Sequence, residues 1–293
     1  MFQIFFELIP AGILQSLILS LVALGVMIPF RLINFPDLTA EGAYPLGGAL
    51  CASLLIAGVN PIVATVLASV AGGMLGLSTA LIHLRFKVNT LLAGIIVSTM
   101  IYSVNLRLMG KPNLALFSEN TTTLFSSIEF LSVKILLLLA INLIMMGLLY
   151  RFLLSEKGLR LRVVGLNPFV AKKQGVHLSQ YIFLGLFAGN LLNSFSGSLM
   201  VQLQQYSDIG MGVGIVIHAL AALMIGESIL GSYTLLRQIL APFIGALIYQ
   251  QIQGLVISLG FAPSDLKLVT GAIVLLAISY KHWSSKGSAS TVI

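Results

Sequence analysis

Charged residues are scarce in this 293-residue sequence, where Asp, Glu, Lys and Arg together make up 9%. A soluble globular domain carries about 25% charged residues, so a fold of this size could not cover a water-facing surface with so few. Hydrophobic residues reach 58%, and the mean hydropathy is +1.03. The composition excludes an ordinary soluble protein and predicts a surface that mostly faces lipid.

Cysteine and histidine are also rare. Cys51 is the single cysteine, so no intrachain disulfide can form. The four histidines lack the spacing of metal ligands, and no Gly-x-x-x-x-Gly-Lys-Ser/Thr motif is present to hold ATP. We therefore expect no metal site and no cofactor bound by this chain. With no His/Asp or Ser/His pair at a plausible depth, we do not expect an enzyme.

The net charge is +7, from 16 Lys and Arg against 9 Asp and Glu. In a chain this apolar, extra basic residues are expected in cytoplasmic loops, so the charge does not indicate nucleic-acid binding.

Long apolar runs repeat from one end of the sequence to the other. They do not alternate as barrel strands would, and about 20 helical residues cross a layer of roughly 30 Å, so we predict helices. The fold class is an all-α polytopic transmembrane bundle of about nine spans (eight to ten). A broken or re-entrant segment at residues 31–48 would change this count. The spans are expected near residues 10–30, 42–58, 61–82, 89–108, 132–154, 180–203, 211–230, 237–260 and 265–281.

These spans form one predicted transmembrane domain, residues 1–283, followed by a Ser/Gly-rich tail at 284–293 that we expect to be disordered.

Basic residues divide unevenly between the two sides of the predicted bundle. Twelve of the 16 fall in the C-terminal tail and in the loops near 31–41, 83–88, 151–179 and 231–237; the other four are Arg107, Lys111, Lys134 and Lys267. The positive-inside rule makes the richer side cytoplasmic. Nine spans then place the N-terminus outside and the C-terminus inside.

The basic loop at residues 155–178 contains a capped segment too short to span a membrane. Asn167 is a good helix N-cap, Pro168 a good first helical residue, and Gly175 a good stop. We predict a helix of about two turns at 167–174 on the cytoplasmic face. It is either an ordinary interfacial helix or one that docks against a partner.

A family resemblance rests on this loop and on six further segments. Gly165-x-Asn167-Pro168-x-x-Ala171-x-x-x-Gly175 resembles the coupling-loop signature of ABC importer permeases of the branched-chain amino acid and ribose class. The chain is most similar to the short permeases of tryptophan- and tyrosine-type ABC uptake systems. Glu41 and Ala43 stand where an aspartate and a serine are expected, which leaves the substrate open. The other matching segments are 34–49, 91–95, 105–111, 210–214, 225–227 and 265–270.

The resemblance implies a complex in the bacterial inner membrane. Its expected partners are a second permease copy or homologue, two cytoplasmic ABC ATPase subunits that bind ATP, and an external solute-binding protein. The expected cargo is a small solute of the amino-acid class, with an aromatic amino acid as one candidate. Lys172 and Lys173 would pair with ATPase carboxylates or only hold the loop at the anionic leaflet. The residues implied in coupling are Gly165, Asn167, Pro168, Ala171, Lys172, Lys173 and Gly175.

Polar residues inside apolar spans indicate a translocation path or bonds between helices. Asp37 and Glu41 lie four residues apart, on one face if the segment is helical. Gly42 and Pro45 beside them suggest a broken helix, as transporters use at binding sites. Bracing the end of the second span is the alternative. The candidate path residues are Asp37, Thr39, Glu41, Asn105, Asn190 and Asn193.

Two other expectations remain open from the residues alone. Glu227, near the inner end of the seventh span, would pair with Arg237 or Arg85. An ion-coupled secondary transporter is the alternative function, for which paired carboxylates in two matching halves would be typical; only Asp37 and Glu41 stand out.

Overall fold

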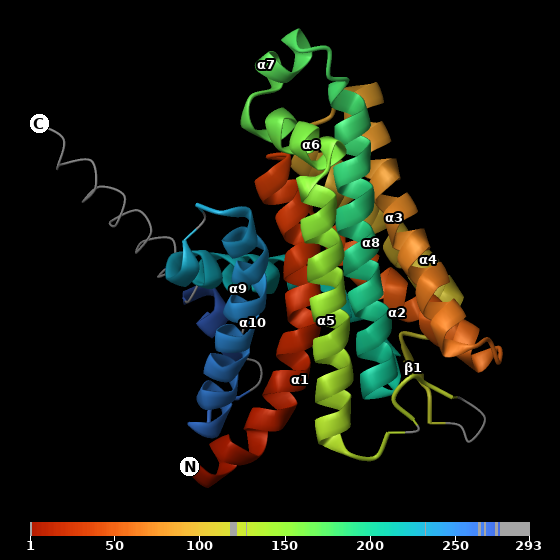
Figure 1. The fold of residues 1–293 in the computed structure, drawn as a ribbon. Helices are drawn as coiled ribbons and strands as arrows, with labels where there is room; N and C mark the ends of the chain where they lie inside the picture. Colours follow the sequence, from red (N-terminus) through yellow and green to blue (C-terminus); the bar gives the residue numbers. More distant parts are fainter. Residues whose placement is uncertain are drawn as a thin grey trace, which may run out of the picture.

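The computed structural model describes residues 2–117, 122–126, 128–231, 233–262, 265–266, 268–272 and 275. Helices dominate this part of the chain, so the fold is nearly all-α (Figure 1). The predicted all-α class holds except for one short pair of strands. The predicted tail at 284–293 and most of the ninth predicted span lie outside the described residues.

Long helices run side by side along the molecule (Figure 1). Within the described residues, seven helical segments are long and apolar enough to cross a membrane. The first of them, α1, continues into a π-helical turn, η1 (Ile28–Leu32). A 3-10 turn, η2 (Ile209–Gly212), lies directly before the sixth of them, α9 (Ile215–Leu230). The seven helices are α1 (Phe2–Met27), α3 (Pro61–Phe86), α4 (Thr90–Met109), α5 (Leu131–Leu154), α8 (Leu178–Gln204), α9 (Ile215–Leu230) and α10 (Leu235–Ser258).

The second predicted span, 42–58, corresponds to the shorter apolar helix α2 (Ala40–Ile56), of 17 residues. Residues 33–39 are not helical, because Asn34 adopts a left-handed φ of 51° and Pro36 disfavours helix at the residue before it. The helical structure is therefore interrupted within residues 31–48, where a broken segment was considered. Nine spans, and the side on which each terminus lies, stay predictions.

Glycines bring the backbones of α2, α3 and α8 into direct contact. A Cβ added at Gly76 would lie 2.2 Å from the carbonyl oxygen of Leu186, and one at Gly47 would lie 2.0 Å from that of Ser194. Helices in lipid associate through such close packing, because the hydrophobic effect does not drive apolar helices together there. The same contacts hold α2 in place although it is short.

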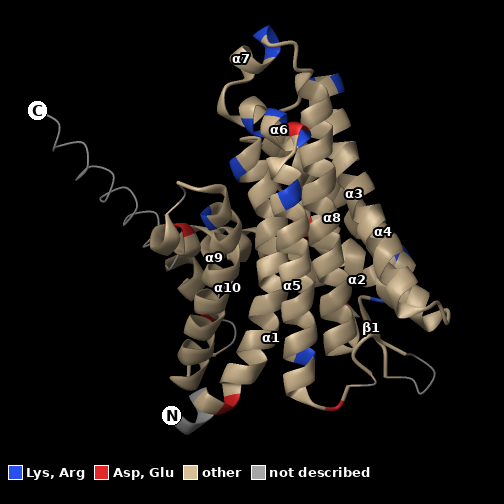
Figure 2. Ribbon diagram, in the orientation of Figure 1, with Lys and Arg blue, Asp and Glu red and all other residues tan. Residues whose placement is uncertain are grey.

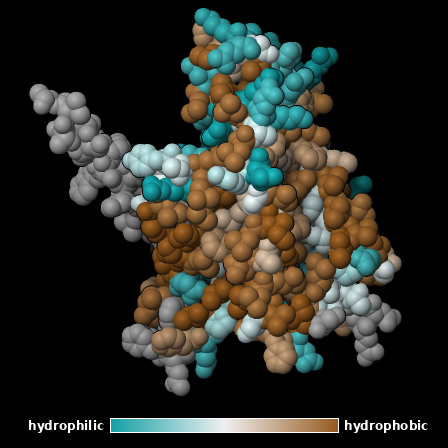
Figure 3. Space-filling view, viewed as in Figure 1, coloured by the Kyte–Doolittle hydropathy of each residue, from teal (hydrophilic) through white to brown (hydrophobic). Residues whose placement is uncertain are grey.

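The two ends of the bundle differ. At one end, β1 (Asn113–Ala115) pairs antiparallel with β2 (Tyr206–Asp208). At the other lie α6 (Glu156–Leu166) and α7 (Pro168–Lys173), around which Lys and Arg gather (Figure 2). Between the ends, the face shown in Figure 3 is broadly apolar. This is the surface that the composition predicted.

Candidate functional site

The predicted short helix is present as α7, and its caps are the predicted ones. The side chain of Asn167 accepts a hydrogen bond from the Val170 amide at 3.1 Å, and Pro168 is the first helical residue. Gly175 has a φ of +76°, a conformation that glycine adopts without strain. Helix α6 was not predicted, although Ser155 is a good N-cap signal for it.

The residues implied in coupling divide into buried and exposed sets. A Cβ at Gly165 would lie 2.0 Å from the Leu32 carbonyl oxygen, so α6 packs directly on η1. Ala171 is fully buried. Gly165 and Ala171 therefore pack against the rest of the protein, whereas Lys172 and Lys173 are exposed.

Apolar side chains that the sequence analysis did not select lie on the outside of this segment. Leu166 is 86% exposed and Phe169 is 66% exposed, and Val170 is exposed beside them. The Lys173 ammonium lies 4.5 Å from the centre of the Phe169 ring, a cation–π contact that favours one ring orientation. The sequence signal for these exposed residues was the presence of apolar side chains in an otherwise basic loop. We call Leu166, Phe169 and Val170 the apolar tip.

Asp37 is buried in a polar cluster where α2 begins. Its Oδ1 accepts hydrogen bonds from the amide, at 2.8 Å, and the hydroxyl of Thr39, and its Oδ2 accepts one from Asn190 of α8 at 2.8 Å. The Thr39 hydroxyl also lies 2.7 Å from the Thr79 hydroxyl of α3. Three candidate path residues, Asp37, Thr39 and Asn190, therefore tie α2 to α3 and α8.

The Asp37→Asn substitution should reduce assembly before it reduces turnover. One carboxylate oxygen becomes an NH₂ group that faces either the Thr39 donors or the Asn190 donor, and a buried donor without an acceptor costs about 1–3 kcal/mol. We expect less monodisperse protein in detergent, with normal uptake per assembled complex. Size-exclusion profiles and uptake normalised to complex test this, with Glu129→Gln on the exposed surface as control. Normal assembly with impaired uptake would contradict the bracing role.

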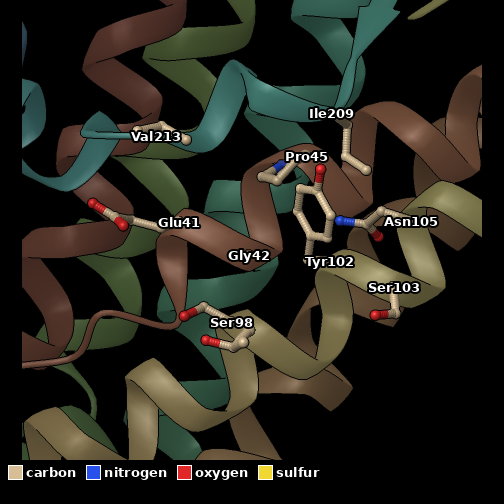
Figure 4. Close-up of a pocket in the computed structure, with 10 residues that line it drawn as sticks. Glu41, Gly42, Pro45, Ser98, Tyr102, Ser103, Asn105, Ile209 and Val213 are labelled. Atoms are coloured by element: carbon tan, nitrogen blue, oxygen red, sulfur yellow. The ribbon is translucent and has the colours of Figure 1, made fainter. Parts of the chain in front are cut away.

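Glu41 does not share a helix face with Asp37, because Asp37 precedes α2. Its Oε1 instead accepts a hydrogen bond from the Gly214 amide at 3.3 Å, and its side chain lines a cavity of about 350 Å³ between α2, α4 and η2. Asn105 of α4 lines the same cavity (Figure 4). Glu41 and Asn105 are the candidate path residues that the fold brings to an open space.

Asn193 and Glu227 lie elsewhere. Asn193 is buried where α8 crosses α1, next to Gly25, which places it between helices. Glu227 forms an ion pair with Arg31 at the end of η1. The expected pairing with Arg237 or Arg85 was wrong, because the break after η1 leaves Arg31 facing α9.

Comparison with known proteins identifies a family that matches nearly the whole sequence. The family described as "Branched-chain amino acid transport system / permease component" matches residues 8–278. The chain belongs to this permease family. It is 41% identical over 263 residues to the "Tyrosine transport system permease protein" of Clostridioides difficile (strain R20291), covering 90% of this chain and 87% of that protein.

A second relative of the permease is an uncharacterized protein of Rickettsia prowazekii (strain Madrid E), 32% identical over 269 residues, which are 90% of this chain and 94% of that protein. No solved structure matches. The permease is a multi-pass inner-membrane protein and a component of a transport system rather than an enzyme. The family that the motifs indicated is confirmed.

Proposed function

We propose that the permease is the membrane-spanning subunit of an ATP-driven ABC importer that carries an amino acid of the aromatic class into the cytoplasm. The observation that supports this most strongly is the 41% identity, over 90% of the chain, to a protein named for tyrosine transport. ATP would bind separate ATPase subunits, because this chain has no P-loop motif. A second permease copy and an external binding protein complete the complex.

The apolar tip of α6 and α7 is the proposed ATPase contact. An apolar patch with an aromatic centre and adjacent lysines is typical of a protein interface. Because Gly165 brings α6 against the Leu32 carbonyl, movement of the tip would pass directly to η1 and to the non-helical residues 33–39. ATP-driven closure of the ATPases would in this way bias the bundle between two states.

Co-purification tests the proposal. The tagged permease, co-expressed with its ATPase and binding protein, should retain the ATPase, and vesicles that hold the complex should accumulate tyrosine only with ATP. Uptake driven by a proton or sodium gradient without ATP would instead establish the ion-coupled alternative. A binding protein that prefers a sugar or a metal ion to aromatic amino acids would overturn the substrate class.

The proposed orientation places α6 and α7 in the cytoplasm, in agreement with the concentration of basic residues there (Figure 2). In a Cys51→Ala background, a cysteine at Phe117, 72% exposed near β1, should react with an impermeant maleimide in intact cells. A cysteine at Leu166 should react only after the membrane is opened. Labelling of both positions in intact cells would contradict this orientation.

A further inference from the structure

The cavity beside Glu41 presents hydrogen-bond acceptors to its interior. The hydroxyl of Ser98 donates to the Ile95 carbonyl at 3.0 Å, and that of Thr99 donates to the same carbonyl at 2.7 Å. Each hydroxyl has one hydrogen, so while that hydrogen is donated to the Ile95 carbonyl the oxygen can only accept a hydrogen bond from a ligand. Both residues line the cavity together with the carboxylate of Glu41.

The Glu41 carboxylate has room for a cationic partner. Its hydrogen bond from the Gly214 amide is long, at 3.3 Å, and a carboxylate accepts about four such bonds. Among the described residues that line the cavity there is no Lys, Arg or His. A partly buried carboxylate without a positive charge nearby is stabilised by a ligand that supplies one.

Asn105 gives an independent indication of a ligand. It is 1% exposed, lines the cavity, and neither its side-chain nitrogen nor its oxygen has a hydrogen-bond partner in the described structure. Buried amides almost always have partners, because leaving one unpaired costs free energy. A polar group of a ligand would supply the missing partner.

The two polar ends are separated by an apolar middle. Figure 4 shows Glu41 and Ser98 toward one end and Asn105 toward the other, with Pro45 and the Tyr102 ring between them. Ser98 and Asn105 are seven residues apart on α4, or about 10 Å along a helix at 1.5 Å per residue. The cavity therefore suits an elongated molecule with a polar group at each end.

We propose that this cavity binds an organic primary ammonium compound. Glu41 pairs with the ammonium group, the oxygens of Ser98 and Thr99 accept its remaining N–H bonds, and Asn105 bonds a polar group at the far end. Pro45 and Tyr102 contact the apolar body between the two. The assignment of an aromatic amino acid as the natural ligand rests on the proposed function; the ammonium site itself rests on the cavity.

Thermal unfolding of the purified permease in detergent tests the site. Tyrosine and tyramine carry the ammonium group, whereas 3-(4-hydroxyphenyl)propionate lacks it. We expect the first two to raise the melting temperature by about 3 °C at saturating concentration, and the propionate to leave it unchanged. Equal shifts from all three compounds, no shift from either amine, or a shift that sodium chloride alone reproduces would overturn the proposal.

Substitutions locate the binding. Glu41→Gln should raise the Kd for tyramine at least tenfold, while Glu129→Gln, the same change at an exposed position, should leave it unchanged. If Glu41→Gln does not fold, Ser98→Ala removes one acceptor and should raise the Kd about threefold. An unchanged Kd in the folded variant would overturn the assignment.

ATP-dependent tyrosine uptake by the wild-type complex, measured in parallel, separates this proposal from the proposed function. Glu41-dependent binding of tyramine without uptake would support the ammonium site and refute tyrosine import. Uptake without Glu41-dependent binding would refute the site and support tyrosine import.

Discussion

Replacing Phe169 with aspartate is expected to reduce ATPase retention and uptake at least thirtyfold, while the permease still inserts and remains monodisperse. Phe169 is 66% exposed in the centre of the apolar tip. Loss of an aromatic interface residue commonly costs 2 kcal/mol or more, about thirtyfold in affinity, and a carboxylate buried without a partner adds to that cost. The permease itself should be unaffected, because this side chain supports little of its core.

Two control variants make the result specific. Phe130→Asp places the same charge on an exposed phenylalanine, 75% exposed, at the start of α5 and should retain the ATPase. Phe169→Tyr keeps the ring and should remain close to wild type. Co-purified ATPase per permease and ATP hydrolysis by the complex are the measurements. Full retention of the ATPase by Phe169→Asp would remove the apolar tip from the interface.

Replacing Gly245 with alanine is expected to destabilise the bundle severely. Helices α9 and α10 meet through paired glycines, since a Cβ at Gly245 would lie 1.7 Å from the Ala222 carbonyl oxygen and one at Gly226 would lie 1.8 Å from that of Ala241. These neighbours are backbone atoms, so no side chain can rotate away. The helices must separate, at a cost of about 3 kcal/mol by analogy with overpacked cores.

Gly254 on the same helix provides the matched control. A Cβ there would meet nothing within 4 Å, and alanine has a higher helix propensity than glycine by about 1 kcal/mol. Gly245→Ala should therefore lower the melting temperature in detergent by about 5–10 °C, whereas Gly254→Ala should leave it unchanged or raise it. Equal behaviour of the two variants would show that the α9–α10 contact does not limit stability.

Composition and local signals were sufficient for the class of fold and for the short helix. The apolar runs predicted long helices because lipid requires every backbone group to be satisfied within its own segment. Asn167, Pro168 and Gly175 predicted α7, since N-cap, first-turn proline and left-handed stop act over only a few residues. The ordered motifs also indicated the family that the comparison confirmed.

Which polar residues lie together depended on contacts between segments that are far apart in the chain. A four-residue spacing suggested that Asp37 and Glu41 act together, yet the non-helical residues 33–39 turn Asp37 toward Asn190 and leave Glu41 at the cavity. Likewise, spacing alone could not show that Gly165 packs inward on Leu32 while Phe169 faces outward. Hydrophobic period and capping are local properties, whereas the partner of a buried polar group is set by where another helix crosses it.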